Sequence, residues 1–215
     1  MRYWNRALWA VATLLVPAMA AGQQGSPDRL TVAFSDPSRP GTVKADVMSG
    51  AITVRGYEGR EVIIVATTRG ESGRGKQPAE AEGMRRIQTQ GSGLEVVEQN
   101  NVIEIETGSF RHAVDLDIQV PRRTSLHLQT INNGEVKVEN VHGDHEVEAL
   151  NGSVTLTGIA GSAVVHALNG RIQAVLTELT PGKSMSFSSM NGDIDVTFPA
   201  VLKANAIMQS DNGEI

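Results

Sequence analysis

Two imidazoles and a carboxylate lie within four positions at His142, Asp144 and His145. Imidazole nitrogens and carboxylate oxygens bind Zn²⁺, but a zinc site needs three or four ligands that converge from separate points. Ala163 stands eighteen residues after His145, so no third histidine occupies a matched position. We therefore predict a structural turn with His142 on it, His145 directed to the interior, and no metal ligand.

A second candidate is the segment 70–76, GESGRGK, which has the glycine and lysine spacing of a phosphate-binding loop. That loop needs serine or threonine directly after the lysine to hold Mg²⁺. Gln77 and Pro78 follow Lys76 instead. We predict a solvated loop that binds no nucleotide and no other cofactor.

Paired carboxylates are the third candidate, because two acids across a sugar ring can cleave or eliminate polysaccharides. Acidic residues predicted to point outward from strands are Glu135, Glu139, Glu146, Glu148, Asp193 and Asp195. The repeats between them carry Ser153, Thr155, Arg171 and Gln173 at the matched positions, which breaks up any cluster. Acidic side chains also solvate an exposed sheet and discourage edge pairing. We predict no catalytic residues and keep a β-helical polysaccharide lyase or hydrolase as the alternative.

The composition of the 215 residues excludes several classes of protein. The chain has 19 Lys and Arg against 24 Asp and Glu, no cysteine, 22 glycines and 4% aromatic residues. An acidic chain is poorly suited to nucleic acid, and a chain without cysteine has no disulfide, thiolate ligand or thiol nucleophile. The core must therefore be built from small aliphatic side chains.

The first twenty residues have the organisation of a secretory signal. Arg2 and Arg6 form a basic region, residues 7–20 are apolar, and Ala18-Met19-Ala20 supplies the small residues of a cleavage site. We predict a signal peptide over 1–20, cleavage after Ala20, and a flexible mature start over 21–27. The mature chain is then expected in the periplasm, on the cell surface or outside the cell.

The rest of the chain is dominated by a repeat. Asn-Gly pairs recur at steps of 18, 18, 22 and 21 residues, and the second and fourth residues after each glycine are apolar. This period of two predicts β-strands with one buried face. An earlier copy begins at Gly50, with Ile52 and Val54 in the same phase. The predicted structural turn residues are Asn133, Gly134, Asn151, Gly152, Asn169, Gly170, Asn191, Gly192, Asn212 and Gly213, with second turns at Gly143 and Gly161 and the earlier copies at Gly50 and Gly59.

The repeat leaves two folds open. Asn and Gly tolerate positive φ, so each pair permits a tight chain reversal, and single pairs fit an antiparallel β-sandwich. Repetition in fixed phase favours an all-β solenoid of stacked two-strand rungs of about 18–22 residues. We predict the solenoid over 28–215, with regular rungs over 125–215. Residues 69–93 break the pattern and are predicted to form a loop or short helix that includes Met84 and Ile87.

The export signal, a strand ending in Pro121 and the successive NG-x-hydrophobic-x-hydrophobic units resemble the bacterial putative-adhesin domain family of β-strand-repeat proteins. The glycines that carry the resemblance are Gly134, Gly143, Gly152, Gly161, Gly170, Gly192 and Gly213. It covers roughly residues 28–215. It implies a β-helical fold in or outside the cell envelope, and no catalytic residues.

These observations predict an exported, non-enzymatic scaffold or binding module of the bacterial envelope, whose flat faces recognise an envelope glycan or protein. A third hypothesis is a structural protein that stacks end to end. The chain stops at Ile215, the first inward position of a new strand, without a capping segment. We therefore expect either a chain cut off mid-rung or an uncapped edge that self-associates.

Overall fold

The computed structural model describes residues 27–69, 85–88, 93–107, 112–132 and 134–201. These residues form strands and no helix, so the all-β prediction is confirmed for them, and no helix in this part of the chain could cross a membrane. The strands are β1 (Asp28–Ala33), β2 (Gly41–Ser49), β3 (Ile52–Tyr57), β4 (Glu61–Arg69), β5 (Arg85–Gln88), β6 (Leu94–Gln99), β7 (Val102–Thr107), β8 (Ala113–Pro121), β9 (Thr124–Asn132), β10 (Val136–Glu139), β11 (His142–Asn151), β12 (Val154–Asn169), β13 (Ile172–Leu179), β14 (Ser186–Ser189) and β15 (Ile194–Thr197).

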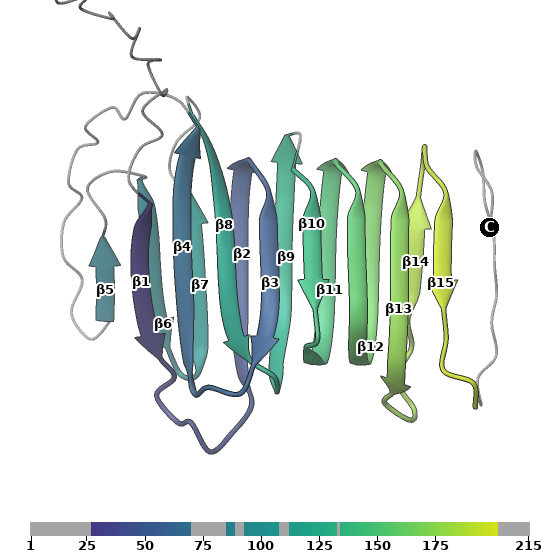
Figure 1. Cartoon of the computed structure of the whole chain (residues 1–215), viewed down its shortest axis with the longest axis horizontal. Coiled ribbons are helices and arrows are strands. Elements are labelled where there is room, and N and C mark those ends of the chain that lie inside the picture. Colours follow the sequence, from purple (N-terminus) through teal and green to yellow (C-terminus); the bar gives the residue numbers. More distant parts are fainter. Residues whose placement is uncertain (1–26, 70–84, 89–92, 108–111, 133, 202–215) are drawn as a thin grey trace, which may run out of the picture.

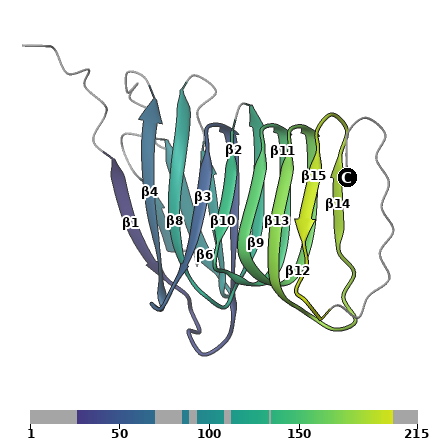
Figure 2. The same cartoon turned by 45° about the vertical axis from the view of Figure 1, so that its right-hand side comes forward.

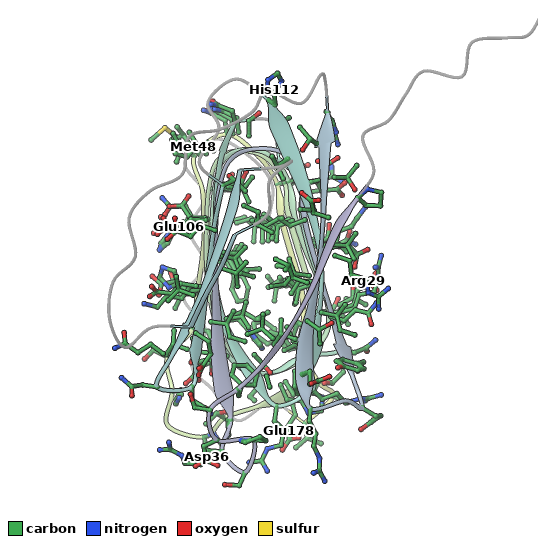
Figure 3. All side chains as sticks on the ribbon, turned by 90° about the vertical axis from the view of Figure 1, so that its left-hand side faces the viewer. Arg29, Asp36, Met48, Glu106, His112 and Glu178 are labelled. Carbon is green, nitrogen blue, oxygen red and sulfur yellow. The ribbon has the colours of Figure 1, made fainter. Side chains whose placement is uncertain are left out.

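All the strands belong to one sheet that folds back on itself into two facing walls (Figures 1 and 2). Wall A contains, in spatial order, β1, β4, β8, β3, β10, the first half of β12, β13 and β15. Wall B contains β5, β6, β7, β2, β9, β11, the second half of β12 and β14. Strand β12 is long enough to pass from one wall to the other. Figure 3 looks along the stack and shows the core side chains between the walls.

Period-two alternation directs the aliphatic side chains inward. In β10, Val136 and Val138 are fully buried, whereas Lys137 between them is exposed. The same alternation in the other strands builds a core of Val, Ile, Leu and Ala with few rings, as the composition predicts. Burial of these side chains is the main driving force that holds the two walls together.

Successive repeats lie side by side as parallel strands in register. Val136 pairs with Val154, Val154 with Ile172, and Ile172 with Ile194, so the steps of the sequence repeat become the steps of the ladder. All pairings among β9 to β15 are parallel in the described chain. The antiparallel sandwich is therefore wrong for this region.

The N-terminal part of the sheet is built differently. Antiparallel pairings join β1 to β4, β4 to β8, β5 to β6 and β6 to β7. The sheet as a whole is therefore mixed, and a solenoid over the whole of 28–215 is not confirmed. The earlier copy is part of the parallel stack, because Ile52 lies beside Val136 on one side and Leu116 on the other. After β3 the chain runs through β4 to β7, and β8 then pairs with β3 on the side opposite to β10.

Several predictions concern other segments. Arg85–Gln88 forms strand β5 paired with β6, so the helical option is wrong there. Pairing with β6 supplies backbone hydrogen bonds that outweigh the weak helical pattern around Ile87. Other predictions lie outside the described residues. These are the predicted signal peptide over 1–20, the loop 70–76, Met84, Asn133, Asn212, Gly213 and the C-terminal end.

Candidate functional site

The Asn-Gly corners align glycines from successive rungs. A Cβ atom on Gly152 would lie 1.9 Å from the carbonyl oxygen of Gly134, and one on Gly170 would lie 2.1 Å from that of Gly152. Gly192 and Gly134 meet the carbonyls of Gly170 and Gly50 in the same way. None of Gly134, Gly152, Gly170 and Gly192 has φ in the left-handed region. The predicted reason for these glycines is therefore wrong, since close stacking of the backbone requires them.

The asparagines of the same corners form a hydrogen-bonded ladder. Asn169 donates its side-chain amide to Oδ1 of Asn151 at 2.9 Å, and Asn191 donates to Oδ1 of Asn169 at 2.8 Å. Asn151 in turn donates to the carbonyl of Ile131 at 3.2 Å. Asparagine thus links rungs along the stack, in place of the predicted positive φ.

Replacing Asn169 with alanine is expected to lower the free energy of unfolding by about 1 kcal/mol, because the central amide of the ladder makes two hydrogen bonds at an exposed site. Gln173→Ala is the matched control, since this side chain is exposed and has no hydrogen bond within the described residues. Urea unfolding measures both. Equal stability of the two variants would contradict a ladder that contributes to stability.

At the opposite corners the chain passes from wall A to wall B within or just before a strand. Gly143 and Gly161, the predicted second turns, are included in β11 and β12 and pair with each other close to these corners. The left-handed residues near these corners are Asn140 and Gly158, with φ of 56° and 67°, although Gly161 itself has φ of 120°. Tight backbone stacking also requires Gly161, because a Cβ there would lie 1.9 Å from the carbonyl of Gly143.

The earlier copy of the repeat has two predicted turn residues, Gly50 and Gly59. Gly50 lies between β2 and β3, has φ of 132° and packs against the backbone of Val114. Gly59 lies between β3 and β4 against the ring of Tyr57, whose hydroxyl donates to the carbonyl of Glu61 at 2.6 Å. Both residues stand at chain reversals between strands of the stack.

An open corner groove of about 560 Å³ runs along the second corners. Asp144 is its polar centre: it accepts hydrogen bonds from Ser162 Oγ and Lys183 Nζ, and its backbone N–H donates to Ser125 Oγ. The bonds from Lys183 and Ser162 hold the pKa of Asp144 below its ordinary value. Arg123 and His142 complete a lining of mixed charge. His142 and Asp144 line this groove, whereas the buried His145 does not, so the structure does not bring the three residues together around one site.

His145 is separated from the groove and points into the core, as predicted. Its side chain is only 2% exposed, and neither ring nitrogen has a hydrogen-bond partner among the described residues. Its ladder neighbours are Leu126 and Ala163, which are also buried. Burial lowers its pKa to about 4, although the backbone carbonyls of Val141 and Ala160 partly oppose the shift. His145 is therefore a neutral core side chain.

The acidic residues considered for catalysis are spread over the outer faces, and several of them pair with basic side chains. Asp193 accepts from Arg171 at 2.7 Å, and Arg55 bridges Asp117 and Glu139 on its two neighbouring rungs. The remaining candidates do not converge: Glu135 pairs with Lys137, Glu146 with His127, while Glu148 and Asp195 stand on different walls. Except for the Glu135–Lys137 pair, these contacts link neighbouring rungs. No group of three or more potential metal ligands occurs in the described chain.

The registered strands arrange exposed side chains in straight rows. On the outer face of wall B, one row runs Glu106, Asp46, Gln129, Glu148, His166 and Ser188. The positions two residues further along are apolar on β2, β9, β11 and β12 and directly after β14: Met48, Ile131, Leu150, Leu168 and Met190. We call this set the apolar stripe. Figure 3 shows Met48 and Glu106 on the outside of the same wall.

The sequence reading missed the apolar stripe although a signal exists. Leu150, Leu168 and Met190 each directly precede the asparagine of an Asn-Gly pair, and Met48 precedes Ser49 of the earlier copy. The inward phase of the alternation predicts only the small buried residues one position earlier, such as Ala149. An apolar residue on the outward phase at every corner is the pattern that predicts the stripe.

Comparison with known proteins gives only distant likenesses. No family model and no curated protein matches the chain. A solved structure described as a putative cell adhesion protein from Clostridium sporogenes is 12% identical, covers 88% of this chain and 99% of its own, and has a TM-score of 0.35. A putative adhesin from Bacteroides fragilis is 8% identical over 80% of this chain and 97% of its own, with a TM-score of 0.34. At TM-scores below 0.5 these likenesses carry no inference for this chain.

Proposed function

We propose that this chain is an exported, non-enzymatic scaffold or binding module of the bacterial envelope. The observation that carries the proposal is the register of the walls, which holds exposed side chains in straight rows on rigid faces. Such rows present a repeated pattern to a partner without the cost of ordering loops on binding. An adhesin-like role for the chain is part of the same proposal.

We also propose a fold for the regular part of the chain. We infer that residues 124–197 wind as a β-solenoid, with one strand in each wall per rung. Parallel pairing at steps of 18, 18 and 22 residues supports this reading, and so do the aligned glycines and the asparagine ladder. The antiparallel strands β1 and β4 to β7 then form a differently built N-terminal end.

The non-enzymatic reading rests on the surroundings of the acids. A general acid for sugar cleavage is usually desolvated and stands opposite a second carboxylate. Asp193 is paired with Arg171, and Asp195, on the strand face beside it, is exposed. The carbohydrate-active enzyme remains the alternative that an activity measurement decides.

Export and activity can be tested on the full chain expressed in a bacterial host. Mass spectrometry of the mature protein is expected to give an N-terminus at Ala21, in agreement with the proposed cleavage site. The purified protein is expected to show no turnover on a panel of acidic polysaccharides. Turnover that disappears in Asp193→Asn/Asp195→Asn and persists in Glu61→Gln would establish the enzyme instead. Long assemblies in sedimentation would favour the self-stacking protein.

A further inference from the structure

The apolar stripe is a line of apolar side chains that are exposed or half-buried on the outer face of wall B. Leu150 is 40% exposed, Leu168 38% and Met190 56%, and Met48 and Ile131 are half-buried. Most other outward positions of wall B carry charged or polar groups. Exposed apolar residues scattered singly need no explanation, but a contiguous line on a polar face indicates an interaction surface.

Register makes the stripe straight. Leu150 and Leu168 lie between two paired positions of β11 and β12, and Met48 and Ile131 lie between two paired positions of β2 and β9. Met190 follows Ser189, which pairs with Ala167. Five neighbouring strands at about 4.8 Å each extend the stripe over about 19 Å along the stack.

Three of the six residues in the row beside the stripe are acidic, and these three lie towards the β7 end of the row. Glu106, Asp46 and Glu148 lie on it, and none of the three forms an ion pair with another described residue. In the next row, Lys44 forms an ion pair with Glu104 at 2.9 Å, and His127 Nδ1 lies 2.9 Å from the Glu146 carboxylate. A partner that covers the stripe therefore meets negative charge along one flank, and cationic side chains complement it.

The spacing selects the shape of the partner. Side chains on one face of an α-helix recur at about 5.4 Å per turn, close to the rung spacing of about 4.8 Å. Alternate side chains of an extended strand are about 6.6 Å apart and lose register within two rungs. A helix of about four turns laid along the stack matches the five apolar positions.

We propose that the apolar stripe and its acidic flank form a docking site for a cationic amphipathic α-helix of a partner protein, lying parallel to the stack. This inference rests on the proposed binding function and names the face and the class of partner. Apolar residues of the helix cover Leu150, Leu168 and Met190, while lysine or arginine on one side meets Glu148, Asp46 and Glu106.

The probe is a fluorescent 14-residue helical peptide with leucines on one face and lysines on the adjoining flank. Anisotropy at low salt is expected to give saturable binding that weakens as salt rises. Leu150→Gln/Leu168→Gln is expected to weaken it at least about tenfold, since two apolar contacts are lost. Asp46→Asn/Glu106→Gln/Glu148→Gln is expected to remove the salt dependence. The matched controls are Val201→Gln, and Glu61→Gln/Glu178→Gln/Asp195→Asn, which alter exposed residues elsewhere.

The outcomes separate this inference from the proposed function. If a scrambled peptide binds as tightly as the designed one, or if the Leu150→Gln/Leu168→Gln variant binds the designed peptide as tightly as the wild type does, the docking site is wrong. The proposed export and absence of turnover are unaffected by that result. Polysaccharide turnover overturns the proposed function without affecting the isotherm. Dimers in sedimentation that dissociate in Leu150→Gln/Leu168→Gln would mean that a second copy covers the stripe, and would also overturn the helix.

Discussion

Replacing Gly152 with alanine is expected to lower the free energy of unfolding by more than about 2 kcal/mol, because the added methyl group has no space. Its Cβ would lie 1.9 Å from the carbonyl oxygen of Gly134, which belongs to the backbone of the rung beside it. A rigid backbone atom cannot rotate away as a flexible side chain can. Relief would require two rungs of the core to separate, at the cost of buried contacts.

Gly182→Ala is the matched control for this prediction. Gly182 has φ of 76°, but a Cβ there meets nothing within 4 Å, so alanine is expected to cost about 1 kcal/mol of backbone strain. Urea unfolding of both variants separates steric exclusion from strain. A Gly152→Ala variant no less stable than Gly182→Ala would show that the glycines do not stack as closely as described.

The second large effect concerns His145 and pH. The folded state holds the His145 pKa at about 4, below the ordinary value of 6.5, so the unfolded chain binds a proton more readily. The contribution of this group to stability is therefore complete above pH 6.5 and is lost as the pH falls towards 4. The shift corresponds to a loss of about 3 kcal/mol by pH 4.

His145→Leu is the variant that tests this loss. Leucine suits the aliphatic ladder beside Leu126, so the variant is expected to fold. It is expected to lack the part of the loss in unfolding free energy between pH 7 and pH 4 that His145 causes in the wild type. His142→Gln, which changes an exposed imidazole, is expected to keep the wild-type pH dependence. The window ends near pH 4 because the folded-state pKa of His145 lies there. Identical pH profiles for wild type and His145→Leu would contradict a neutral buried imidazole.

Local patterns in the sequence predicted the ladder well. Val136, Val154 and Ile172 carry the same alternation, and their alignment follows from the repeat length alone. Even Ile52, eighty-four residues before Val136, was placed in the correct phase. Period-two burial is a local property, so it can be read from one strand at a time.

Features that depend on neighbouring rungs were not predicted. The close approach at Gly152 and the hydrogen bonds at Asn169 arise only when rungs stack. A single Asn-Gly pair read by itself predicts positive φ instead, because neighbouring rungs are not visible in the local sequence. The insertion of β3 between β8 and β10 depends on a chain excursion through β4 to β7. The paired state of Asp193 likewise depends on Arg171, a residue 22 positions earlier.

The most direct test of the proposed envelope binding is the isotherm of the purified chain on isolated bacterial envelopes, measured beside the polysaccharide panel. The account predicts saturable binding that Leu150→Gln/Leu168→Gln weakens and Val201→Gln does not, with no turnover. Absence of saturable binding by the wild-type chain, or release of sugar products from the envelopes, would contradict it.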